Sequence, residues 1–262
     1  MNASITSYWN VPTWNPYSKT STSYDNDHNP LTELQQHINA NLTLSNTSLR
    51  TKTYDNNGNL LTELSQSWNS GSAAWQNYSK YTYTYDAANH ELSYLSQSWD
   101  QAGNSWKDNF KTINTYRGNN LASEIYQYVN SSTNMLENDT KYTYVYDIFN
   151  KVISGMAYSW NPVNSTWENQ EKYTATYSGN NMISVLAQIW NSINSTWENG
   201  YKYSFTYDAN NNQTSEIDES YDNSTNMWIT EYKFTVTYDT HHNQLSSLSQ
   251  EKGSEHQLPY KC

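Results

Sequence analysis

The residues that could take part in chemistry recur along this chain at a fixed spacing, and they do not converge on one place. An aspartate recurs at multiples of about 30 residues, at Asp25, Asp55, Asp86, Asp147, Asp208 and Asp239. Acid–base or nucleophilic catalysis requires unlike groups gathered at one site. A chain that repeats the same groups at near-equivalent places does not meet that requirement. We therefore predict that the protein is not an enzyme and has no catalytic residues.

The metal-binding and nucleophilic residue types give no site either. The histidine pair at 241–242 lies in a polar segment typical of a turn, and no histidine spacing resembles a zinc site. Cys262, at the last position, has no evident triad partner. Asp55, Asn57 and Asn59 could offer oxygens to Ca²⁺, but aspartate and asparagine at turns bond their own backbone, which explains them without a metal. We predict no cofactor and no metal site, with Ca²⁺ at these turns as the alternative.

Aromatic side chains are the other groups whose chemistry matters, since the chain has 25 Tyr and 11 Trp. Amphipathic rings with asparagine and glutamine donors nearby suit stacking against sugars. The candidate sugar-stacking residues are Trp68, Trp75, Trp99, Trp106, Trp160, Trp167, Trp190 and Trp197. Packing within β-hairpins explains the same rings equally well, because leucine or valine replaces tryptophan at equivalent positions such as Leu44 and Val129.

The elements that must position these residues are β-strands. Residues 80–86 alternate strictly, with Tyr81, Tyr83 and Tyr85 on one face and lysine, threonine and aspartate on the other. Period-two alternation in aromatic and β-branched residues predicts a strand with two different faces. The last of these tyrosines recurs every 30 or 31 residues, at Tyr24, Tyr54, Tyr85, Tyr116, Tyr146, Tyr177, Tyr207 and Tyr238. The chain is therefore a tandem repeat.

Each repeat contains two predicted strands joined by a polar loop. In one copy these are 60–68 and 75–85, with a loop at 69–74 and a turn at 86–89. Eight such hairpins plus one extra strand give about 17 antiparallel strands in one domain over 1–250, followed by a tail at 251–262. We predict an all-β fold, a curved or superhelical meander sheet that encloses its Tyr/Trp/Leu face. The alternative is a β-propeller.

Two further polar residues recur at equivalent positions of the repeats. A lysine lies five residues before the repeated tyrosine, as at Lys172, with Leu49 as the exception. A glutamine recurs in the first strands, as at Gln66 and Gln188. We expect rows of tyrosine, glutamine and tryptophan to stack on their equivalents in neighbouring hairpins.

Charge and hydropathy exclude several classes of partner. The formal net charge is −11 and the basic residues are dispersed, which argues against binding to nucleic acid. No apolar run approaches the roughly 18 residues that a membrane-spanning helix needs. The first residues lack a charged and an apolar region, so they predict no signal peptide.

The segment at 54–60, Tyr-Asp-Asn-Asn-Gly-Asn-Leu, resembles the motif of YD repeats in Rhs-type and teneurin-type proteins. The longer unit is similar to tandem repeats in large secreted bacterial surface proteins. Only Gly58 holds the glycine of the family's turn, while Asn89, Asn150 and Asn211 replace it, and the period is longer than usual. The chain also lacks an Rhs-type toxin domain and a type IX sorting domain. The resemblance implies an extracellular β-repeat shell or stalk and no particular ligand.

The odd strand at each end of the meander motivates the functional prediction. Open sheet edges are templates for pairing with another chain. The residues of these edges are Ile5, Tyr8, Trp9, Leu245, Leu248 and Gln250. We predict an extracellular or cell-surface structural or adhesive repeat protein, which assembles through its end strands into filaments or a surface layer. Its expected partners are other copies, surface proteins or glycans. The alternative is a carbohydrate-binding module that uses the repeated tryptophans.

Overall fold

The computed structural model describes the backbone over residues 2–10 and 13–252 and the side chains over 17–252. The strands are β1 (Asn2–Asn10), β2 (Thr13–Tyr24), β3 (Pro30–Ile38), β4 (Leu44–Tyr54), β5 (Leu60–Asn69), β6 (Ala74–Tyr85), β7 (Glu91–Asp100), β8 (Ser105–Arg117), β9 (Asn120–Asn130), β10 (Met135–Tyr146), β11 (Val152–Asn161), β12 (Thr166–Ser178), β13 (Asn181–Asn191), β14 (Thr196–Tyr207), β15 (Gln213–Asp222), β16 (Met227–Tyr238) and β17 (Gln244–Glu251). In that part of the chain no helix is long and apolar enough to cross a membrane.

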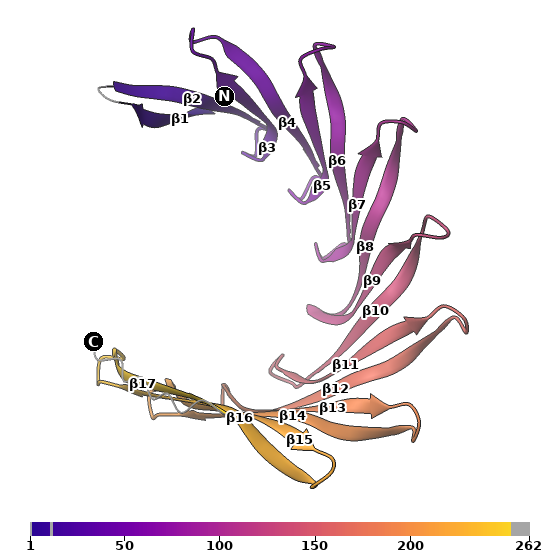
Figure 1. Cartoon of the computed structure of the whole chain (residues 1–262), viewed down its shortest axis with the longest axis vertical. Coiled ribbons are helices and arrows are strands. Elements are labelled where there is room, and N and C mark those ends of the chain that lie inside the picture. Colours follow the sequence, from indigo (N-terminus) through magenta and orange to yellow (C-terminus); the bar gives the residue numbers. More distant parts are fainter. Residues whose placement is uncertain (1, 11–12, 253–262) are drawn as a thin grey trace. The chain divides into compact units, whose positions relative to one another are not determined.

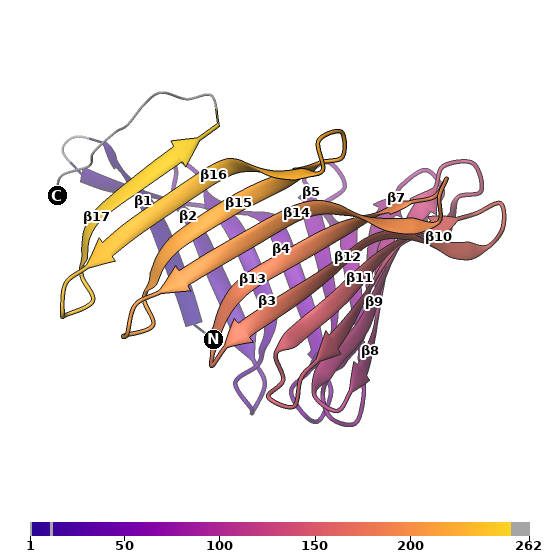
Figure 2. The ribbon, with the colours of Figure 1, turned by 90° about the horizontal axis from the view of Figure 1, so that it is seen from below.

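The chain divides into two compact units, each of which is a meander. Unit 1 comprises the described parts of 1–119 and 124–139, and unit 2 those of 120–123 and 140–262. Within each unit successive strands pair antiparallel with the next strand along the chain, as Figures 1 and 2 show. The predicted all-β meander of about 17 strands is confirmed, and the propeller alternative is wrong, because pairing runs on from hairpin to hairpin.

The predicted domain limits were 1–250, with a tail at 251–262. A single repeat domain over 1–250 stays a prediction. Glu251 is the last residue of β17 and pairs with Tyr232, so the sheet extends one residue into the predicted tail. Lys252 follows and donates its backbone N–H to the carbonyl of Glu231 at 2.9 Å. The rest of the predicted tail, Cys262 included, lies outside the described residues.

Two β-bulges recur in the repeats, and the sequence did not reveal them. In the hairpin β5–β6, Ser65 pairs with Ser79 and Gln66 with Asn77, so Tyr78 is the extra residue. Between β4 and β5 the register shifts again, which leaves Leu61 as the extra residue. A bulge bends its strand and increases the local twist. The meander therefore acquires its curvature at fixed positions.

The first bulge also marks where neighbouring hairpins separate. The ladder between β12 and β13 ends at Glu171 and Ile189, whereas β11 and β12 continue to pair with each other out to Asn161 and Thr166. We call the part of a hairpin beyond its first bulge a finger: residues 158–169 in β11–β12 and 188–199 in β13–β14. Figure 1 shows the outer ends of successive hairpins standing apart. Each finger is a two-stranded arm that projects from the sheet.

The sheet is a single layer with little interior. Among the described side chains, the buried apolar residues are Ala175, Ala187 and Val236, and no side chain is less than 2% exposed. The predicted tryptophans are all half-buried. The expected common Tyr/Trp/Leu face is wrong, because Lys80 pairs with Leu64 and Tyr81 pairs with Glu63, which puts the repeated tyrosines on the face opposite the leucine and the tryptophans. Within each unit, contacts of any extent between described residues join consecutive strands, so no second layer of that unit covers the sheet. Stability must come from links between neighbouring hairpins.

Candidate functional site

The eight predicted tryptophans meet in four pairs, one in each of four fingers. Trp68 lies opposite Trp75, and their ring centroids are 5.0 Å apart with planes inclined at 69°. The pairs Trp99–Trp106, Trp160–Trp167 and Trp190–Trp197 repeat this edge-to-face geometry at 5.0 Å. Such pairs stabilise a hairpin by about 0.5–1.5 kcal/mol beyond burial. The expected stacking of tryptophans between hairpins is wrong for these pairs, since each ring meets its partner within its own finger.

The repeated lysine of one hairpin lies over the ring of the second tryptophan in the following finger. The Lys172 Nζ lies 5.2 Å from the ring centroid of Trp197, and the Lys202 Nζ lies 5.3 Å from that of Trp228. An ammonium over an indole face is attracted by the ring quadrupole. The lysines expected on the outer surface therefore connect successive hairpins, and they occupy part of the ring surface that a sugar would use.

One groove brings together tryptophans of two successive fingers. It has a volume of about 550 Å³ and lies between β12 and β13, lined by Trp167, Glu168, Asn169, Gln170, Trp190 and Ser192. Its lining combines two indole rings with a carboxylate, amides and a hydroxyl. That combination is the one predicted for a sugar site, and the separation of the fingers beyond the bulge creates it. Both tryptophans were candidates from the sequence, but the sequence could not predict that they line one groove.

The aspartates of the repeat organise tight turns. The Asp55 Oδ1 accepts the backbone N–H of Asn57 at 2.8 Å and of Asn59 at 2.9 Å, and its Oδ2 accepts the Asn59 side-chain amide at 2.9 Å. These bonds, led by that of the Asn59 side chain, lower the pKa of Asp55. Gly58 has a φ of 82°, and asparagine or histidine takes this left-handed position in other copies. Both carboxylate oxygens thus serve the turn.

Within each unit, these turns are hydrogen-bonded to the equivalent turns of neighbouring hairpins. The Asn59 side chain donates to the Asn89 Oδ1 at 2.8 Å, and Asn181 donates to Asn211 at 3.0 Å. The repeated tyrosine adds a second link, since the Tyr207 hydroxyl donates to the carbonyl of Met182 at 2.9 Å. These bonds span 25–30 residues. The repeat period therefore places equivalent groups within hydrogen-bond distance.

The loops at the finger tips use an aspartate or asparagine in a related way. Asp222 accepts bonds from the side chain and backbone of Ser224 and from the Thr225 hydroxyl, which lower its pKa to about 2. Asn191 takes the equivalent place in another finger and accepts the N–H of Ile193 at 3.0 Å. An amide can therefore replace the carboxylate in this loop.

The substitution Asp222→Asn is expected to reduce the acid sensitivity of the protein. A carboxyl with a folded-state pKa below its unfolded value of about 3.9 stabilises the fold above that value. This stabilisation is lost as the pH falls through the folded-state pKa of about 2. The wild type should therefore lose more thermal stability than the variant between about pH 4 and pH 2. Circular dichroism melts measure this, and parallel losses in both proteins would contradict the assignment.

The predicted assembly residues lie on the two end strands. Within unit 2, β17 pairs with β16, with Leu248 opposite Thr235 and Gln250 opposite Lys233. Leu245 falls at the second bulge and is 58% exposed. Within unit 1, β1 pairs with β2. The side chains of Ile5, Tyr8 and Trp9 lie outside the described residues.

The titratable groups of the described ranges include no metal-binding cluster. Across residues 2–10 and 13–252, no three histidine, cysteine, aspartate or glutamate side chains are grouped so as to hold a metal ion. Burial raises the pKa of Asp218, with Glu216 adding to the effect. Burial also raises the pKa of Glu91. Both shifts follow from burial and from a nearby carboxylate, which is Glu216 for Asp218 and Glu124 for Glu91.

Comparisons with known proteins give partial matches. Residues 118–200 match DUF3836, a family of unknown function, over less than half of the chain. No curated protein matches. A protein of unknown function from Bacteroides fragilis is 24% identical, with 47% of this chain and 89% of that chain covered and a TM-score of 0.42.

Two further solved structures illustrate the range of the likeness. A DUF3836 family protein from Bacteroides vulgatus is 26% identical, over 35% of this chain and 91% of that chain, with a TM-score of 0.31. A TcdB2-TccC3 structure is 14% identical, over 98% of this chain and 17% of that chain, with a TM-score of 0.41. The chain is thus similar over residues 118–200 to a family whose function is unknown.

Proposed function

We propose that this protein is a non-enzymatic, extracellular repeat scaffold, structural or adhesive in role, of the kind that YD-type surface repeats form. The observation that carries the proposal is the repetition of its interactions. Tryptophan pairs, lysine–tryptophan contacts and turn-to-turn amide bonds recur from hairpin to hairpin. A surface that repeats its groups suits an extended or multivalent contact better than turnover at one centre.

The end strands supply the route to self-association in this proposal. In unit 2, β17 pairs with β16 along one edge, and most residues of β17 are exposed and polar. An unpaired edge presents a row of N–H and C=O groups to a strand from another copy. Filaments or a surface layer would follow from repeated pairing of this kind.

Proline substitution at two neighbouring positions of β17 tests the route. In an antiparallel ladder, one residue directs its N–H to one side and the next residue directs its N–H to the other side. Of Ser247→Pro and Leu248→Pro, one variant therefore removes a donor facing β16 and the other a donor facing away. We expect the variant that loses the donor facing away from β16 to abolish association and keep the thermal midpoint. The variant that loses the donor facing β16 should weaken the β16–β17 pairing.

Sedimentation velocity and negative-stain microscopy over a range of concentrations give the result. A wild type that stays monomeric at every concentration would contradict self-association. Oligomers that persist in both proline variants would show that another surface mediates it.

The groove between two fingers favours a second candidate function, carbohydrate binding. Trp167 and Trp190 face a polar groove of about 550 Å³, a size typical of small-ligand sites. Loss of oligosaccharide binding in Trp167→Leu, with the fold intact, would support this function. Unchanged binding would exclude the groove.

A further inference from the structure

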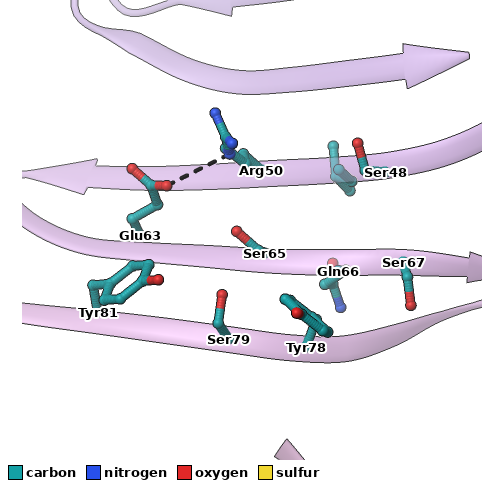
Figure 3. A pocket seen from close by; sticks show the side chains of 10 residues that line it. Ser48, Arg50, Glu63, Ser65, Gln66, Ser67, Tyr78, Ser79 and Tyr81 are labelled. Atoms are coloured by element: carbon teal, nitrogen blue, oxygen red, sulfur yellow. Dashed lines mark ion pairs between the residues drawn. The ribbon is translucent and has the colours of Figure 1, made fainter. Parts of the chain in front are cut away.

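A hollow on β4, β5 and β6 has the features of a binding site that is separate from the tryptophan groove. It has a volume of about 410 Å³ and lies entirely within unit 1. Figure 3 shows that serine hydroxyls from the three strands lie along it, with Tyr78 and Tyr81 on the β6 side. Ser48 pairs with Ser67, and Ser65 pairs with Ser79, so these hydroxyls share one face of the sheet.

The hollow lies where successive repeats carry serine at a position that holds an aromatic side chain in three other repeats. The position directly after the first bulge holds Ser18, Ser48 and Ser79 in the first three hairpins. The equivalent positions hold Phe110 in β8, Tyr201 in β14 and Tyr232 in β16. Small residues at neighbouring positions leave a depression that larger ones would fill. The depression therefore follows from the small side chains at this position in the N-terminal hairpins.

Two aromatic rings border the hollow. Tyr78 is the bulged residue and is 69% exposed, although its ring lines the hollow. Tyr81 stacks on Tyr94 with centroids 5.7 Å apart and planes inclined at 13°, which fixes its orientation. Each tyrosine offers a flat apolar face with a polar tip.

The charged residues that line the hollow, Arg50 and Glu63, belong to a group of ion pairs that balance one another. The Arg50 guanidinium lies 3.6 Å from the Glu63 Oε1 and 3.8 Å from the Glu33 Oε1, and the Lys52 Nζ lies 3.3 Å from the Glu63 Oε2. Two basic and two acidic groups sum to no formal charge, so the hollow does not select a strongly charged ligand. A guanidinium has five N–H donors and a carboxylate only acceptors, which together with the serines suits a ligand rich in hydroxyls.

We propose that this hollow binds a pyranose unit of a neutral glycan. The apolar face of the sugar ring packs against Tyr78, and the sugar hydroxyls exchange hydrogen bonds with the serines, Arg50 and Glu63. The proposal depends neither on pairing of the end strands nor on the groove at Trp167 and Trp190.

The test measures binding of a panel of neutral oligosaccharides to the full chain by isothermal titration. The panel contains glucose, xylose and mannose oligomers, and a uronic acid oligomer serves as the charged comparison. Ser79→Phe fills the hollow with the residue that the chain itself has at Phe110, and Tyr78→Ala removes an exposed wall. We expect each to weaken binding by about tenfold or more, the effect of losing one good contact.

Tyr201→Ala is the matched control, because Tyr201 is 51% exposed and belongs to unit 2. It should bind as the wild type does. No binding of any neutral oligomer to the wild type would overturn the proposal, as would binding of the uronic acid oligomer alone. Binding that survives Ser79→Phe and is lost in Trp167→Leu would assign the glycan to the groove and overturn it too. Sedimentation of Ser79→Phe should match the wild type, which separates this proposal from self-association.

Discussion

Replacing Gly155 with valine is expected to lower the free energy of unfolding by about 1–3 kcal/mol, the range for overpacking. Gly155 in β11 lies opposite Tyr173 in β12, whose ring covers it. A Cβ at this glycine would lie 2.3 Å from the Tyr173 Cε1 and 2.4 Å from its Cζ. The ring must therefore swing away and lose the burial that raises the pKa of Tyr173. Urea denaturation of unit 2 within the full chain measures the loss.

The double variant Gly155→Val/Tyr173→Ala provides the control. With the ring absent, valine should be tolerated and its high strand propensity should be favourable. The effect of Gly155→Val is then smaller in the Tyr173→Ala background than in the wild type. Equal effects in both backgrounds would show that the ring is not the cause.

Replacing Trp190 with alanine is expected to unfold one finger and leave the rest of the sheet paired. The change removes the edge-to-face contact with Trp197 and the burial of a large ring, about 1–3 kcal/mol for a half-buried site. An isolated two-stranded hairpin is marginally stable at best, and this finger has no backbone ladder to its neighbours beyond Ile189. Hydrogen exchange should therefore quicken at 190–199 and stay slow at 181–189.

Ile189→Ala is the matched control for this finger. Ile189 is 40% exposed and lies opposite Glu198, next to the tryptophan pair but on the other face. It should leave the exchange of residues 190–199 close to that of the wild type. Uniformly faster exchange over the whole of unit 2 in Trp190→Ala would contradict the independence of the finger.

The period of the tyrosines was enough to predict the hairpins, because alternation and spacing are local properties of the chain. The bulges were not predicted, since a bulge is a mismatch in length between two strands. One signal was present. Trp75 and Lys80 lie five residues apart, and uninterrupted alternation would place them on opposite faces. They pair with Trp68 and Leu64, which share a face, so one extra residue must lie between them.

The candidate sites depended on still longer-range information. Trp167 and Trp190 were predicted as candidate sugar contacts, but their groove exists only because adjacent fingers separate beyond the bulge. The hollow needs the registers of three strands to place Ser48, Ser67 and Ser79 together. Serines in a chain rich in serine and threonine carry no signal of their own. The contrast with Phe110 becomes visible only after the bulges align the repeats.

The absence of a shared interior in the described sheet has a consequence for how such a chain can change in length. Each hairpin is held by bonds to the hairpin before it and the hairpin after it, such as the lysine over the next tryptophan. Duplication or deletion of one repeat therefore leaves every remaining neighbour contact of the same kind. A globular domain would have to rebuild its core after such an event. Here gene recombination could alter the reach of the protein in steps of one hairpin without a new packing problem.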